Sequence, residues 1–368
     1  MILAGCGATG QPSGPAPTPG TLEDGNRDPN AVSPLGKTRG EPNDSFEDAI
    51  VAVYQGRGVA RLQGAISPYG DVDVFHLGAM QPGDALRVSA WAADSSLDIC
   101  IALYDDQGRL FVMDDDSGEG FNALADQPVR RAGDPYYLAV YASPFAVRAE
   151  SAVGAYEVTV TVTRGGDVPA PEGQVLYLGF DGVVLDVPSI PITQVPPFRA
   201  GDISPVYAGQ TEAMKAGIVA TVQQNFEGLN VTIVTSDDES LPDGPMSRVY
   251  FGGLSSIAYG ISESVDTYNS DPTDVAVVFT ESFRPRLFSR TPTTEEMAIA
   301  IGNIASHEAG HLLGLHHVND PEALMDESGP ADTFLADQRF KEALLSPNIA
   351  PLGTQDALLL LAEILGLL

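Results

Sequence analysis

The chain has 368 residues, of which 50 are acidic and 19 basic, so its formal net charge at pH 7 is −31. This excess of negative charge argues against nucleic acid or an anionic membrane surface as a partner. Hydrophobic residues make up 43% of the sequence, which is enough for buried cores, and the length predicts two domains of ordinary size.

Residues 1–40 contain a candidate modification site followed by a candidate tether. Leu3, Ala4, Gly5 and Cys6 resemble a bacterial lipobox, in which the cysteine is exposed by cleavage and lipidated, although only two residues precede the motif. Residues 7–40 are rich in Gly, Pro, Thr and Ser, a composition typical of a disordered tether. The resemblance implies an extracellular or cell-envelope lipoprotein that reaches the membrane through Cys6. The alternative is an accidental match at a disordered terminus.

Residues 41–164 predict an all-β domain. Short β-like runs are separated by turn signals such as Gln-Pro-Gly-Asp at 81–84 and Asp-Asp-Gln-Gly at 105–108. This spacing indicates a β-sandwich. The runs that we expect as strands are 59–63, 73–77, 85–90, 97–104, 136–141 and 156–163.

The order of short motifs in this domain resembles that of a known module. EPNDS at 41–45 is followed by GDVDVFHL at 70–77, LYDDQG at 103–108, YYLAV at 136–140 and GAYEVTV at 154–160. This order is similar to that of the bacterial pre-peptidase C-terminal (PPC) domain, a jelly-roll-like module carried by secreted peptidases. In those relatives the module often follows the catalytic domain, whereas here it precedes the second domain.

Two acidic loops offer oxygen ligands of the kind that Ca²⁺ prefers, so a structural calcium ion is one interpretation of each. The other interpretation, which we favour for both, is an acidic loop solvated by water. The loops comprise Asp114, Asp115, Asp116 and Glu119 in the first domain, and Asp237, Asp238, Glu239 and Asp243 in the second.

Residues 165–173 form a linker rich in Gly, Pro and Asp, and the pattern then changes to alternating strands and helices. This alternation predicts an α/β (α+β) domain over 174–368. A second helix is expected to start at the capping signature Thr293-x-x-Glu296 and to end near Leu313. The expected strands are 175–180, 231–235, 248–251, 275–280 and a weaker edge strand at 257–261, with the first helix at 211–226 and a C-terminal helix within 355–368.

The sequence HEAGHLLGLHH at 307–317 carries four of the five histidines of the chain. On a helix, His307 and His311 share one face, as two nitrogen ligands of a tetrahedral Zn²⁺ require. Gly314 can take a positive φ and end the helix, so that His317 can approach from outside it as a third ligand. Three protein ligands leave a fourth position open, the arrangement of a catalytic zinc. Glu308 lies one residue along, close enough to hold a metal-bound water without being a ligand.

This pattern, H-E-x-x-H-x-x-G-x-x-H with a methionine eight residues later at Met325, resembles that of the metzincin metallopeptidases. The resemblance implies a zincin fold, zinc ligation by the three histidines, a general-base role for Glu308, and an apolar floor under the metal formed by Met325. His316 competes with His317 as third ligand, and the family spacing favours His317. Because Glu327 stands where some subfamilies carry a tyrosine ligand, the nearest likeness is to matrixin-like bacterial members.

The sequence therefore predicts a multidomain protein, a jelly-roll-like sandwich followed by a metzincin domain, that acts as a secreted or surface-anchored zinc endopeptidase on polypeptides. An alternative is a surface- or matrix-binding protein whose zinc domain is structural or inactive. A third hypothesis is zinc-dependent hydrolysis of a non-peptide amide.

Overall fold

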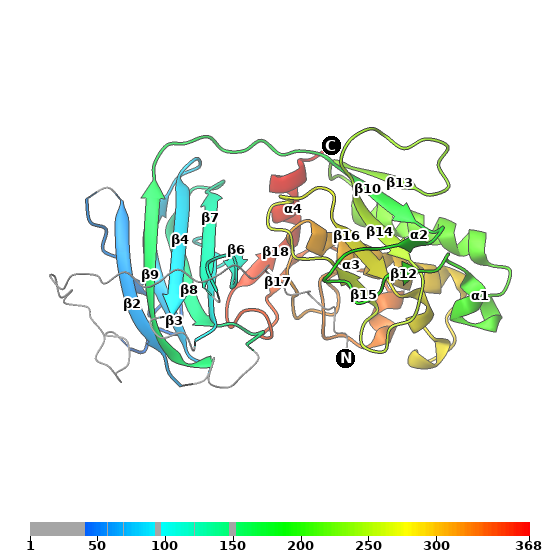
Figure 1. Cartoon of the computed structure of the whole chain (residues 1–368), viewed down its shortest axis with the longest axis horizontal. Helices are drawn as coiled ribbons and strands as arrows, with labels where there is room; N and C mark the ends of the chain where they lie inside the picture. The colour runs from blue at the N-terminus through cyan, green and yellow to red at the C-terminus, as the bar shows by residue number, and fades with distance from the viewer. Residues whose placement is uncertain (1–40, 57, 69, 93–96, 121, 147–151) are drawn as a thin grey trace. The chain divides into compact units, whose positions relative to one another are not determined.

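The structure is a computed structural model that describes residues 41–368 except 57, 69, 93–96, 121 and 147–151. Cys6 and the expected tether lie outside the described residues. The chain divides into two compact units (Figure 1). The described part of the β-sandwich unit comprises residues up to Pro169 together with Pro347–Thr354, and the α/β unit comprises Ala170–Ser346 and Gln355–Leu368. None of the helices in the described ranges is long and apolar enough to cross a membrane.

The β-sandwich unit contains two sheets. Burial alternates along strands such as β4 and β9, because one face of each sheet packs inward. All pairs are antiparallel except β1 with β3. The strand order of the first sheet is β1 (Ile50–Val51), β3 (Val72–Met80), β8 (Gly133–Ala142), β5 (Ile99–Tyr104) and β6 (Leu110–Asp114). The strand order of the second sheet is β2 (Val59–Ile66), β9 (Gly154–Thr163), β4 (Ala85–Ala92) and β7 (Ala123–Pro128).

Each of the six runs expected as strands overlaps an observed strand. Strands β1, β6 and β7 were not expected, because β1 has two residues and the other two contain Asp or Pro, which are depleted in strands. Cys100 lies fully buried in β5, where it packs as a small apolar side chain.

Residues 347–354 come late in the chain but belong to the β-sandwich unit, whereas the sequence placed them in the second domain. The hydroxyl of buried Tyr104 donates to the Leu352 carbonyl at 3.0 Å, and that of Tyr141 donates to the Ile349 carbonyl at 3.2 Å. Because a buried hydroxyl must find an acceptor, the carbonyls of this segment help to satisfy both tyrosine side chains.

The α/β unit is built on a five-stranded sheet with the order β13, β10, β14, β16, β15. The first four strands are parallel, and β15 pairs antiparallel with β16 at the edge. The expected edge strand at 257–261 is therefore present, shifted to Gly260–Ser262. The strands are β10 (Gln174–Gly179), β13 (Val231–Thr235), β14 (Ser247–Phe251), β15 (Gly260–Ser262) and β16 (Val275–Val278).

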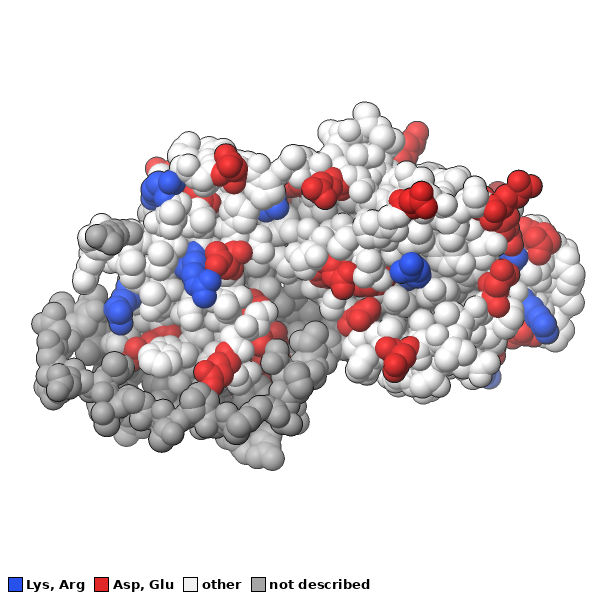
Figure 2. All heavy atoms as spheres, turned by 45° about the horizontal axis from the view of Figure 1, so that its top comes forward, with Lys and Arg blue, Asp and Glu red and all other residues white. Residues whose placement is uncertain are grey.

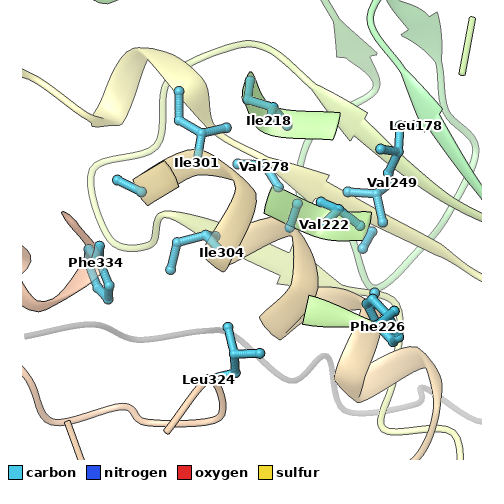
Figure 3. Packing of buried hydrophobic residues seen from close by; sticks show 14 of the residues in the cluster. Leu178, Ile218, Val222, Phe226, Val249, Val278, Ile301, Ile304, Leu324 and Phe334 are labelled. Carbon is cyan, nitrogen blue, oxygen red and sulfur yellow. The ribbon is translucent and has the colours of Figure 1, made fainter. Parts of the chain in front are cut away.

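Two long helices, α2 (Thr211–Asn225) and α3 (Thr294–Leu312), pack with this sheet around one apolar core (Figure 3). Ile218 and Val222 of α2 meet Ile301 and Ile304 of α3, as the i, i+3 and i+4 spacing requires. The C-terminal helix α4 (Ala357–Leu365) adds buried leucines to the same core. The remaining elements are β11 (Val183–Val184), β12 (Gln194–Val195), α1 (Ala200–Ile203), η2 (Pro205–Tyr207), η3 (Thr280–Ser282), η4 (Pro285–Leu287), η5 (Ala331–Leu335), β17 (Glu342–Leu344) and β18 (Thr354–Asp356).

Acidic side chains outnumber basic ones on the face shown in Figure 2. They are spread over the surface rather than gathered into one patch. On this face the negative charge is therefore distributed rather than concentrated.

Candidate metal centre

Helix α3 begins where the capping signature places it. The hydroxyl of Thr293 accepts from the Glu296 backbone N–H at 3.2 Å, and the Glu296 carboxylate accepts from the Thr293 N–H at 2.8 Å. This reciprocal capping box satisfies two N–H groups that the helix leaves unpaired. From Met297 onward nearly every residue of α3 is buried, so the helix carries the histidine motif into the protein interior.

The three histidines chosen from the sequence converge on one point. The Nε2 atoms of His307 and His311 are 3.2 Å apart, those of His311 and His317 are 3.0 Å apart, and those of His317 and His307 are 3.2 Å apart. A tetrahedral zinc with bonds of about 2.0–2.1 Å requires nitrogens about 3.3–3.4 Å apart. The triangle therefore fits a zinc ion, with small adjustments of the rings.

The rings of His307 and His311 are each oriented by a contact of the second ring nitrogen, Nδ1. Nδ1 of His307 lies 2.7 Å from the Leu324 carbonyl, and Nδ1 of His311 lies 2.7 Å from the Leu315 carbonyl. A carbonyl can only accept, so each Nδ1 carries the proton and each Nε2 presents its lone pair. Burial lowers the pKa of His307 to about 3 and that of His311 well below its usual value, with His317 adding to both effects. Neutral imidazole is the form that binds a metal.

The turn after α3 selects between the two candidates for the third ligand. Gly314 has φ +87°, and it reverses the chain so that His317 joins the triangle. The backbone of His316 is held instead by the amide of Gln355, which accepts from the His316 N–H at 2.7 Å and donates to its carbonyl at 2.8 Å. The His316 ring is not part of the converging group.

Glu308, which follows His307 in the sequence, is buried in the protein interior. Its side chain is 1% exposed, and its Oε2 has no hydrogen-bond partner among the described residues. Burial raises its pKa to about 8. A Cβ at Gly260 of the edge strand would lie only 2.4 Å from Glu308 Oε1, so the carboxyl group rests directly against this glycine.

Met325 packs against the middle of the motif. It is 1% exposed, and a Cβ at Gly310 would lie 2.6 Å from its sulfur. The Met325 carbonyl accepts from the Val318 N–H at 2.9 Å, which ties the methionine to the residue after His317. The structure therefore places Met325 beside the motif helix, and the glycine within the motif makes room for it.

Sequence reasoning missed several residues that shape the site. Gly260 and Gly310 leave room for Glu308 and Met325, and neither has a signal beyond being glycine. Asn303, one turn before His307, donates to the carbonyls of Phe334 and Ala336 at 3.0 and 2.8 Å, and so holds the segment that follows the motif. Glu327 was noted only as the absence of a tyrosine, yet its Oε2 lies 3.1 Å from His317 Nδ1.

The acidic loops considered for calcium are not among the described groups whose ligand atoms converge. Asp114 accepts from the backbone of Ser117 and Leu124, and Asp115 accepts from the Ser143 hydroxyl. The convergent acidic group that the described residues do contain is Glu41, Asp44 and Asp71.

The site lies in the part of the chain that matches a known family. Residues 246–333 match the sequence model of the matrixin family. A comparison with curated proteins found no match. This segment runs from the residue before β14 to η5, so it includes the edge strand, the whole histidine motif and Met325.

Three solved structures are similar to parts of this chain at low identity. Archaemetzincin from Methanopyrus kandleri is 14% identical, over 52% of this chain and 95% of that protein, with a TM-score of 0.27. The pre-peptidase C-terminal domain of a collagenase from Bacillus anthracis is 17% identical, over 28% and 88%, with a TM-score of 0.21. A periplasmic inhibitor of g-type lysozyme from Aeromonas hydrophila is 14% identical, over 31% and 96%, with a TM-score of 0.25.

The family match and the histidine triangle fall on the same residues of the α/β unit. Residues 246–333, which contain the histidine triangle, are therefore a segment similar to the matrixin family, as the metzincin-like motif predicted.

Proposed function

We propose that this protein is a zinc-dependent endopeptidase that acts on polypeptides outside the cytoplasm and is anchored to the cell envelope through Cys6. The observation that carries the peptidase proposal is the triangle of three Nε2 atoms beside the buried carboxyl group of Glu308. The lipobox-like sequence at Cys6 and the likeness of residues 41–164 to a module of secreted peptidases support the location.

His307, His311 and His317 would hold the metal, since their lone pairs face one point and their Nδ1 protons are already bonded. A zinc ion held there supplies a Lewis acid and an acidified water. Glu308 acts as the general base and then as the general acid: its carboxylate takes a proton from the attacking water and later gives it to the leaving amine.

The edge strand gives the substrate a place to bind. Among the described strands, β15 pairs only with β16, so its outer edge can accept an extended peptide by β-addition. Gly260 belongs to this strand and contacts Glu308, so a peptide paired there would pass close to the general base. Backbone pairing of this kind recognises an extended polypeptide whatever its side chains.

The test compares the wild type with Glu308→Gln, a variant that keeps the shape of the side chain but cannot take a proton. Unfolded casein is the substrate, and zinc per chain is measured on the same samples. We expect about one zinc in both proteins and a turnover about 10²–10⁴-fold lower in the variant, the range that a general base contributes. Glu295→Gln, an exposed change on the same helix, is the matched control and should cleave normally.

The outcomes separate the competing functions. Unchanged cleavage by Glu308→Gln would remove Glu308 from the mechanism. One zinc per chain without cleavage by the wild type would favour a surface-binding protein with a structural zinc. Cleavage of a small amide but not of casein would favour a non-peptide substrate, and a wild type without zinc would refute the proposal.

A further inference from the structure

The three histidines of the metal centre are oriented by two kinds of partner. His307 and His311 donate through Nδ1 to main-chain carbonyls at 2.7 Å. Nδ1 of His317 instead faces the Glu327 carboxylate at 3.1 Å, and the two side chains are only 4% and 13% exposed. A buried carboxylate holds an N–H more strongly than a carbonyl does, because the acceptor carries a full charge.

His317 also needs this partner more than the other two histidines do. His307 and His311 are fixed by helix α3, which sets their spacing and direction. His317 follows Gly314 in an irregular segment, where no regular element orients its ring. The ring direction must therefore come from side-chain contacts.

Glu327 is itself held in place by a closed set of hydrogen bonds. The Ser346 hydroxyl donates to Glu327 Oε1, and the Ser346 N–H donates to the His317 carbonyl at 3.0 Å. The Glu327 N–H donates to the Val318 carbonyl at 3.3 Å. His317, Glu327 and Ser346 thus form a ring of contacts in which each residue bonds to the other two.

We propose that Glu327 is a positioning residue for the third ligand. Its carboxylate keeps the proton of His317 on Nδ1 and aims Nε2 at the centre of the triangle, and Ser346 holds the carboxylate in that orientation. Glu327 acts through His317, whose Nδ1 its carboxylate faces. The inference rests on the proposed function in that the group held by the triangle is zinc. Carboxylate partners of this kind change metal affinity about 10–100-fold.

The experiment measures the zinc affinity of the purified full chain by competition with a chelator, with Zn²⁺ as the only added metal. Glu327→Gln keeps an acceptor oxygen without charge, and we expect about tenfold weaker zinc binding. Glu327→Ala removes the acceptor, and we expect about 100-fold weaker binding. Ser346→Ala, which frees the carboxylate to rotate, should weaken binding severalfold. Glu322→Gln, an exposed glutamate of the same segment, is the control.

Two further readouts distinguish positioning from a general loss of structure. The thermal unfolding temperature of the zinc-free variants should match that of the zinc-free wild type. The Co²⁺-loaded Glu327→Gln protein should show altered visible absorption, because the ligand geometry changes. If Glu327→Ala does not fold, Glu327→Gln and Ser346→Ala decide. Zinc affinities of these variants within threefold of the wild type would overturn the proposal.

The affinity measurement also separates this inference from the proposed function. If the variants lose zinc while the wild type binds it but does not cleave, the role of Glu327 stands and the peptidase proposal fails. If the wild type cleaves with zinc and the Glu327 variants bind zinc equally well, the peptidase proposal stands and this inference fails. A wild type that takes up no zinc refutes both.

Discussion

The metal centre joins two regions that are built in different ways. Helix α3 supplies His307, Glu308 and His311 from one continuous element, whose capping box and buried face follow from the local sequence. The segment after Gly314 supplies His317 and Met325 without regular structure. We call helix α3 the helix half of the site and the segment after Gly314 the loop half. The geometry of the helix half is set by residues close in the sequence, whereas that of the loop half depends on partners far along the chain, including Ser346 and Gln355.

This difference shows where the site can be broken. A change in the helix half that preserves the helix removes one chemical group and leaves the others in place, as with Glu308→Gln. A change in the loop half shifts a ligand, because each contact there supports the next. The three predictions below test this contrast, from the largest expected effect to the smallest.

The largest effect is expected for Gly314→Ala, at the boundary between the two halves. A Cβ there would lie 2.8 Å from the Asp266 carbonyl oxygen, and the backbone has φ +87°. The positive φ costs about 1–2 kcal/mol and the overpacking about 1–3 kcal/mol, so we expect a loss of about 2–5 kcal/mol in the free energy of unfolding. Zinc affinity should fall as well, because His317 moves.

Gly209→Ala is the matched control for this change. Gly209 also has a positive φ, +79°, but a Cβ there meets nothing within 4 Å. Denaturant unfolding should show a loss of only about 1–2 kcal/mol, with zinc affinity unchanged. Equal losses in the two variants would show that the contact with Asp266 does not matter.

A smaller effect is expected for Gly260→Ala, in the edge strand beside the helix half. The new methyl group would displace the Glu308 carboxyl, since the contact of 2.4 Å is too short for a Cβ. Misplacing a reacting group by about 1 Å costs up to about 100-fold in rate, so we expect casein turnover to fall about 10–100-fold. Zinc per chain should not change, because no histidine moves.

For this change the control is Gly201→Ala, where a Cβ would lie in ordinary contact at 3.7 Å from Ala208. Loss of zinc from Gly260→Ala would contradict the contrast between the two halves. It would show that displacing the Glu308 carboxyl also moves the histidines of the helix half.

The smallest effect concerns Asp274, in the loop between β15 and β16. This loop is tied to the end of α3 by the Asp266 N–H, which donates to the His311 carbonyl at 2.9 Å. Burial raises the pKa of Asp274 to about 8, with Asp266, Glu263 and Asp271 adding to the shift and the Ser247 hydroxyl opposing it. The carboxyl is therefore held neutral in the folded state.

A raised pKa favours the folded state at low pH, and this contribution is lost as the pH rises from about 4 through about 8. We therefore expect Asp274→Asn to be more stable than the wild type by about 1 kcal/mol or more near pH 8, since a buried charge is removed. Thermal unfolding at pH 5 and pH 8 measures this. A stability difference that does not grow with pH would contradict the assigned titration.

Much of the α/β unit could be predicted because its signals are local. The apolar periodicity of α2, the short buried strands and the capping box of α3 each lie within a few residues of one another in the sequence. Short strands such as β6 and β7 could not be predicted, because Asp and Pro hide their pattern and pairing with neighbours overrides propensity. The segment 347–354 could not be assigned either, because its partners are tyrosines more than 200 residues earlier.

The amino-acid sequence by itself determined the chemistry that can occur at this site, because helical spacing places His307 and His311 on one face and Glu308 next to them. It also made His317 a candidate, through Gly314 and the motif spacing. Only the tertiary structure decided that His317 rather than His316 completes the triangle, that Gly260 contacts Glu308, and that Glu327 and Ser346 orient the third ring. The physical reason is that helix geometry is set by neighbouring residues, whereas a loop takes its conformation from whatever packs against it.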